Sequence, residues 1–216
     1  MMIESSERVD DRRKSTTLRA VRRLAVPLRN AGLRGLLLFS PKTRVGGLTV
    51  ASLSADDYFD DSVAKVSLAL DLIGLHAPRR LGQVQRELQW VILVAGSANY
   101  FLPGLRAHVV GAREICEASP EYLAVSLVHE ATHARLERLG FRFDPEREWR
   151  IEALCVDEAA SLAVGIPGCE DLARHTRDAL RVPWWGADRV RAQRLQQLEA
   201  HGIPTWVRRL YAAFTK

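Results

Sequence analysis

Two histidines and a glutamate form the most informative pattern in this 216-residue chain. His129, Glu130 and His133 fit the pattern His-Glu-x-x-His inside a largely apolar stretch. On a helix, positions four apart lie on one face, so the two imidazoles can bind a single metal ion. Glu130 can then reach a water molecule bound to that ion. The competing interpretation is a pair of solvent-facing histidines on a polar helix stripe.

The residues on either side of the motif predict two consecutive helices. Ser119-Pro120-Glu121 and Asp144-Pro145-Glu146 each place a capping residue, a proline and an acid at a helix start. Gly140 is typical of the residue that follows a helix end. We therefore expect one helix over about 120–139 and a second over about 145–164, joined by a short loop.

A third ligand has to come from outside the motif, because a catalytic zinc ion needs three protein ligands and one open position. One known continuation places a glycine and then a histidine shortly after the second motif histidine. It is excluded because those positions are Leu136 and Leu139. The predicted second helix offers carboxylates instead, at Glu146, Glu148, Glu152, Asp157 and Glu158.

Height along an antiparallel pair of helices favours Glu152 among these acids. At about 1.5 Å per residue, His133 lies ~9 Å and His129 ~15 Å from the end of the first helix. Glu152 lies ~10 Å along the second helix, between the two histidine levels. Glu148, at ~5 Å, is too low and Glu158, at ~20 Å, is too high.

Cys155 stays open as an alternative ligand. It lies ~15 Å along the second helix, level with the site and one turn from Glu152. A buried packing cysteine is the simpler interpretation of its apolar surroundings. The expected metal ligands are therefore His129, His133 and Glu152, with Glu130 as the general base.

The motif and the later Glu152 resemble the zincin metallopeptidases, most closely the gluzincin-type branch with a glutamate as third ligand. The resemblance covers residues 120–164. The chain lacks that branch's Glu-x-x-x-Asp form, because position 156 is Val156. The resemblance implies a Zn²⁺ cofactor, a peptide or protein substrate, and an edge strand that precedes the active-site helix and pairs with extended substrate. We expect that strand at 105–111.

The remaining patterns predict an α+β fold, with a small, mostly antiparallel sheet packed against helices and a helical C-terminal region. Strands are expected at 36–39, 48–53, 90–95 and 105–116, and further helices at 16–26, 56–75 and 78–88. Among the histidines outside the motif, His76 and His108 are expected to be ordinary residues. Candidate donors to a reaction oxyanion lie downstream at His175, Arg177, His201 and Tyr211. Trp184, Trp185 and Trp206 are expected to anchor the C-terminal core.

Charge separates an N-terminal arm from the body of the chain. Residues 1–45 carry eleven basic and four acidic side chains, whereas the remainder carries 20 basic and 22 acidic ones. We expect a disordered basic arm over 1–15 and a single metallopeptidase domain over 16–216. The arm is suited to an acidic partner or an anionic membrane surface. Scattered cysteines and the lack of a visible signal or membrane segment predict a cytoplasmic protein.

Three functions follow from these patterns. The first is a zinc-dependent hydrolase, most simply a metallopeptidase that uses Glu130 to activate water. The second is a structural or regulatory zinc protein, which a fourth ligand such as Cys155 would favour. The third is a nucleic-acid-binding module acting through the basic arm, which the slightly acidic body disfavours.

Overall fold

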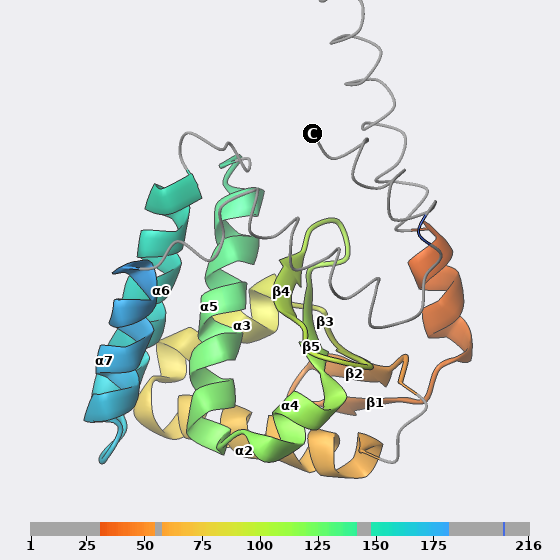
Figure 1. The fold of residues 1–216 in the computed structure, drawn as a ribbon, viewed down its shortest axis with the longest axis horizontal. Helices are drawn as coiled ribbons and strands as arrows, with labels where there is room; N and C mark the ends of the chain where they lie inside the picture. The colour runs from red at the N-terminus through yellow and green to blue at the C-terminus, as the bar shows by residue number, and fades with distance from the viewer. Residues whose placement is uncertain (1–30, 55–57, 142–147, 182–204, 206–216) are drawn as a thin grey trace, which may run out of the picture. The chain divides into compact units, whose positions relative to one another are not determined.

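The structure, a computed structural model, describes residues 31–54, 58–141, 148–181 and 205 (Figure 1). The chain divides into two compact units, Met1–Pro41 and Lys42–Lys216. The described part of the first unit is helical over 31–39, so the strand expected at 36–39 is wrong. This segment is built from Ala, Gly, Leu, Arg and Phe, with no β-branched residue, and its Ala, Leu and Arg favour a helix.

The second unit contains a five-stranded sheet in the order β1-β2-β3-β5-β4. Its strands are β1 (Lys42–Val45), β2 (Leu48–Ser52), β3 (Trp90–Val94), β4 (Asn99–Leu102) and β5 (Ala107–Gly111). The pairs β1–β2 and β4–β5 are antiparallel, whereas β2–β3 and β3–β5 are parallel. The α+β class is confirmed, but the expectation of a mostly antiparallel sheet is wrong. The helical connection between β2 and β3 allows a parallel pairing that a tight turn cannot make.

The strand expected over 105–116 is shorter and lies elsewhere in the sheet. β5 ends at Gly111 and the chain turns at once into a helix. β5 is interior, between β3 and β4, so the expected edge strand at 105–111 is wrong. Gly111 is required here because a Cβ atom would clash with the carbonyl oxygen of Gly96. On this side of the sheet the edge strand is β4, which lies in a segment whose sequence predicts a turn.

Six α-helices of this unit are described, together with a short 3-10 turn at Ala179–Arg181. They are α2 (Phe59–His76), α3 (Pro78–Glu87), α4 (Ala112–Glu117), α5 (Pro120–Arg138), α6 (Glu148–Gly165) and α7 (Glu170–Asp178). The helices expected at 56–75, 78–88 and 120–139 are confirmed. The predicted helix at 16–26, the capping residues Asp144–Glu146 and the three C-terminal tryptophans lie outside the described residues.

Helix α5 is the central element of this unit. It contacts α2, α3, α6 and the strands β4 and β5 (Figure 1). Its start is capped as expected, with the Ser119 hydroxyl accepting a hydrogen bond from the Tyr122 backbone N–H at 3.2 Å. Its end is followed by Gly140, which has a φ of 87°. Most of α5 is buried over 123–134, so its orientation is set by packing on several sides.

Helix α3 forms ion pairs with both α5 and α6. At the end of α5, the two Arg138 nitrogens donate to the fully buried Glu87 carboxylate at 2.8 and 2.9 Å. Near the start of α3, Arg80 forms an ion pair with Glu158 of α6 at 3.0 Å. Bidentate arginine–carboxylate pairs fix geometry as well as adding energy. These pairs therefore hold α5 and α6 against a common support.

We expect Glu87→Gln to lower the melting temperature by ~2–4 °C, the scale of one lost charge-assisted contact in a chain of this size. Arg138 lowers the pKa of Glu87, against the opposing effect of burial, so the carboxylate stabilises the fold when ionised. This stabilisation is present above the unfolded pKa and is lost as pH falls through the lower folded pKa. The difference between variant and wild type should therefore be large at pH 7 and vanish at strongly acidic pH.

Thermal unfolding followed by circular dichroism across that pH range measures this difference. Glu117→Gln is the matched control, because Glu117 is exposed and pairs only with Arg113 one turn away. Equal melting temperatures for wild type and Glu87→Gln at pH 7 would contradict the prediction.

No helix among the described residues is both long enough and apolar enough to cross a bilayer.

Candidate metal centre

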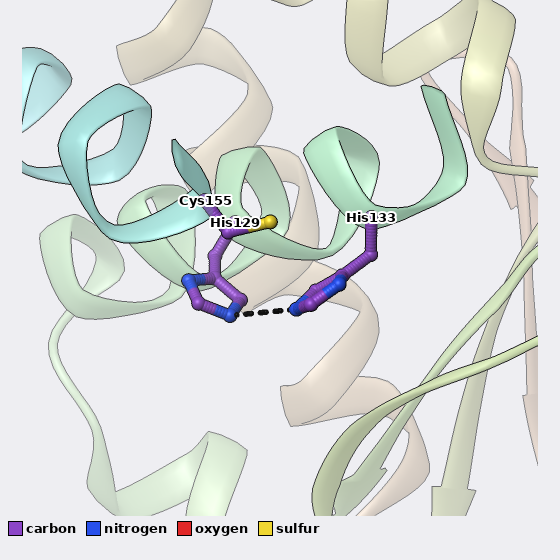
Figure 2. Close-up of side chains that lie close together, drawn as sticks. All are labelled: His129, His133 and Cys155. Carbon is purple, nitrogen blue, oxygen red and sulfur yellow. Dashed lines mark hydrogen bonds between the residues drawn. The ribbon is translucent and has the colours of Figure 1, made fainter. Parts of the chain in front are cut away.

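The two motif histidines lie on consecutive turns of α5 and face one another. Their Nε2 atoms are 3.1 Å apart, and each side chain is only 12% exposed. Figure 2 shows both rings reaching from α5 to the same side, with nitrogens directed toward each other. The four-residue spacing therefore does place two imidazole donors at one point. The interpretation of solvent-facing histidines is excluded by their burial.

Glu152 of α6 completes a three-donor cluster. One carboxylate oxygen, Oε1, lies 3.3 Å from His133 Nε2, and the other, Oε2, lies 3.5 Å from His129 Nε2. Glu152 is itself 3% exposed. The other acids of α6 lie outside this cluster: Glu158 pairs with Arg80, and Glu148 is buried one turn earlier. Helix packing thus brings together the three residues that the sequence ranked first.

The donor groups are close enough to share one ion. Zinc–nitrogen and zinc–oxygen bonds of about 2.0–2.1 Å at tetrahedral angles place neighbouring ligand atoms roughly 3.3 Å apart. The two imidazole nitrogens are 3.1 Å apart, and each lies near a different oxygen of Glu152, His133 at 3.3 Å from Oε1 and His129 at 3.5 Å from Oε2. Oε2 of Glu152 has no hydrogen-bond partner among the described residues, although it is buried. A cation between these atoms would supply the missing partner.

Charge and hydrogen bonding couple Glu152 to the two histidines. Burial alone would raise the pKa of Glu152, but its contacts with His129 and His133 outweigh burial and lower the pKa to about 2. The pKa of His133 moves the opposite way: burial opposes the shift, and Cys155 and Glu152 raise it well above its ordinary value. Glu152 is therefore an ionised donor at neutral pH.

Cys155 lies next to the cluster, one turn after Glu152. Its sulfur and donor nitrogens of His129 and His133 lie within 4.8 Å of one another (Figure 2). Cys155 is fully buried, and burial raises the pKa of its thiol, which the nearby His133 only partly offsets. A metal ion would itself deprotonate a ligating thiol. Glu152, with an oxygen 3.3–3.5 Å from each imidazole nitrogen, and Cys155 are therefore the two candidate donors that α6 adds to the histidine pair.

Glu130 directly follows His129 on α5 and is close enough to His133 to interact with it electrostatically. It is 4% exposed, and its Oε2 atom has no hydrogen-bond partner among the described residues. Glu130 and His129 both line a pocket of about 690 Å³ bounded by α4, α5, α6, α7 and β4. A buried carboxylate oxygen without a partner is costly, so the site is suited to a proton-bearing group that enters from this pocket.

A polar network on the edge strand borders the same pocket, and the sequence gives little sign of it. The Asn99 Oδ1 atom of β4 lies 2.8 Å from His108 Nε2 and accepts from Ser126 Oγ at 3.1 Å. His108 is fully buried in β5, as expected for an ordinary core histidine. The only signal for β4 is the short run Asn-Tyr-Phe-Leu between two glycine-containing turns.

Two of the four candidate oxyanion donors, His175 and Arg177, lie among the described residues. His175 of α7 lines the pocket beside His129 and Glu130. Arg177 is on the same helix but not in that lining. His201 and Tyr211 lie outside the described residues.

No protein-family model, curated protein or solved structure matches this chain. The interpretation of the site therefore rests on its own geometry.

We expect purified protein reconstituted with Zn²⁺ to hold about one ion per chain, and His133→Ala and Glu152→Ala to lose most of it. Removing either donor leaves two ligands, too few for a stable site. Metal content after gel filtration, read by atomic emission, measures this. Asp157→Asn, at an exposed position of the same helix, is the control and should retain zinc. Full retention in Glu152→Ala would transfer the third-ligand role to another residue.

Proposed function

We propose that this protein is a zinc-dependent hydrolase, and most simply a peptidase that cleaves an amide bond. The observation that carries the proposal is the placement of Glu130. This buried carboxylate has an oxygen without a hydrogen-bond partner among the described residues, directly follows His129 of the donor cluster, and lines a pocket of about 690 Å³ together with that histidine. A purely structural metal site has no use for such a carboxylate.

The donor set assigns the metal chemistry. His129, His133 and Glu152 would hold the ion, and His129 also lines the pocket. When bound, the ion would lower the pKa of a coordinated water and stabilise negative charge on a carbonyl oxygen. Zinc suits two imidazoles and one carboxylate better than Mg²⁺ or Ca²⁺, which prefer oxygen ligands alone.

The chain's own residues would handle the proton. Glu130 accepts a proton from the attacking water and later returns it to the leaving amine. Its burial excludes bulk water from that transfer. His175 lines the same pocket and is the described candidate for a hydrogen bond to the developing oxyanion.

We expect Glu130→Gln to keep zinc and to lose hydrolysis by at least ~10²-fold, the usual contribution of a positioned general base. The amide preserves size but cannot accept the proton. Zinc content and peptide cleavage by mass spectrometry are measured on the same preparation. Glu121→Gln, in the first turn of α5, is the control and should keep both. A Glu130→Gln variant with wild-type turnover would contradict the assigned role.

Strand β4 is the substrate strand in this proposal, replacing the segment 105–111. The resemblance to zincins implies an edge strand beside the active-site helix, and β4 contacts α5 at the edge of the sheet. The Gly111 N–H donates to Ala98 O at 2.8 Å. The alternation of antiparallel pairing then directs the main-chain groups of Asn99 and Phe101 away from β5, where an extended peptide can pair.

We expect Phe101→Pro to raise KM by up to ~10-fold relative to Phe101→Ala, because only the proline removes the outward N–H. The alanine variant controls for the ring, which stacks on His133 at a centroid distance of 6.3 Å. Steady-state cleavage of one peptide by both folded variants makes the comparison. Equal KM values would remove β4 from substrate binding.

The second candidate function is a structural or regulatory zinc site, which the proximity of Cys155 favours. A fourth protein ligand would close the open position. The two functions differ in their response to metal removal, since chelation unfolds small domains that depend on structural zinc. A peptidase site should lose its ion to a chelator with little change in circular dichroism, and Cys155→Ala should still bind zinc and cleave.

A further inference from the structure

The pocket beside Glu130 has a one-sided charge pattern. Three carboxylates line it, from Glu114, Glu130 and Asp171, and no lysine or arginine is found among its described lining residues. The remaining wall is largely apolar, from Val125, Val156, Ala159, Leu172 and Ala179. Carboxylates inside a cleft with apolar walls concentrate negative potential there. The pocket is therefore suited to a group with an apolar body and a positive end.

Glu114 of α4 is the carboxylate available for such a group. Glu130 is committed to proton transfer, and Asp171 is 88% exposed in its side chain and paired with Arg174. Glu114 is about half-buried and accepts hydrogen bonds only from neutral donors, the Ser97 hydroxyl at 3.4 Å and the Ala98 backbone. No cationic side chain of the described residues affects it. Burial raises the pKa of Glu114, an effect that a bound cation would reverse.

The distance between Glu114 and the metal cluster favours a ligand with a long side chain. Glu114 lies near Tyr122, which shares the pocket and precedes His129 by seven residues of α5. Seven residues of helix span about 10 Å. A lysine or arginine stem reaches about 6 Å from its Cα atom, and the Cα atom next to a reacting carbonyl adds roughly 2–4 Å. The α-amino group of the same residue would fall several ångströms short.

We propose that this pocket binds the lysine or arginine side chain of a residue next to the scissile bond, with Glu114 as its counter-charge. The proposal rests on the proposed function, because the same metal cluster fixes where the scissile bond lies. The apolar wall packs against the methylene stem while the charged end reaches Glu114. An acidic side chain in the same place meets two further carboxylates and is excluded by repulsion.

The test uses the full-length, zinc-loaded protein and three alanine-based octapeptides with lysine, norleucine or glutamate at one central position. Norleucine keeps the stem and lacks the charge. We expect kcat/KM for the lysine peptide to exceed that for norleucine by ~10-fold, the scale of one charge-assisted contact, with glutamate lowest. Glu114→Gln should bring lysine and norleucine to within about 2-fold of each other.

Glu117→Gln is the matched control. Glu117 is on the same helix, pairs with Arg113 at 2.7 Å and does not line this pocket, so the lysine preference should be unchanged. Glu114→Lys should reverse the peptide preference in favour of glutamate, because it replaces the carboxylate with a positive charge. Cleavage without a lysine preference, or a preference equal in wild type and Glu114→Gln, would overturn the assignment while leaving the hydrolase proposal intact.

A binding measurement separates this inference from failure of the hydrolase proposal. Zinc-loaded Glu130→Gln is titrated with the same three peptides carrying a fluorescent label, and anisotropy gives their dissociation constants. Tighter binding of the lysine peptide that Glu114→Gln abolishes supports the inference even when the wild type cleaves nothing. Equal binding of the lysine and norleucine peptides overturns it.

Discussion

The candidate metal site depends on the close approach of α5 and α6, because neither helix carries all three of its donor residues. Two imidazoles come from one helix and the carboxylate from the other; Glu152 is buried, and the histidine side chains are only 12% exposed. Both helices bury several alanines, including Ala131 and Ala134 of α5 and Ala159 and Ala163 of α6. Small side chains let helix axes approach closely. The ion pairs of α3 with both helices then keep that approach in register.

Burying these groups together is costly, and the arrangement limits the cost in a specific way. Charged groups in a protein interior destabilise the fold unless they are paired. Here the Glu152 carboxylate lies against the two imidazoles, which lower its pKa, but its Oε2 atom has no hydrogen-bond partner among the described residues. Oε2 of the neighbouring Glu130 also lacks such a partner. Two buried carboxylate oxygens of one site are thus left for groups that the described residues do not supply.

The meeting of His129, His133 and Glu152 could be anticipated from sequence because it depends mainly on two consecutive helices that pack against each other. The rise per residue then sets the heights of the three side chains along the pair. The sheet could not be anticipated in the same way. Segment 36–39 is an apolar run with no β-branched residue, and such a run fits a helix or a strand equally well until its neighbours are known.

β4 illustrates the same difficulty. Its four residues lie between glycine-containing turns, and its partner β5 follows only after a further turn. Nothing in the local pattern states that β5 is interior, because strand order is a property of the whole sheet. The pocket is formed by residues of α4, α5, α6, α7 and β4, so no local sequence signal marks Asn99 and Glu114 as part of its lining.

The shortness of β4 limits how much of a bound chain it can hold. A strand of four residues turns only two of them outward, so backbone pairing covers about 7 Å of an extended partner. In the proposed peptidase, so few backbone hydrogen bonds would hardly fix the register of a bound peptide. Side-chain pockets would then decide which bond is presented. The same shortness reduces the risk that two copies of the chain will associate through this exposed sheet edge.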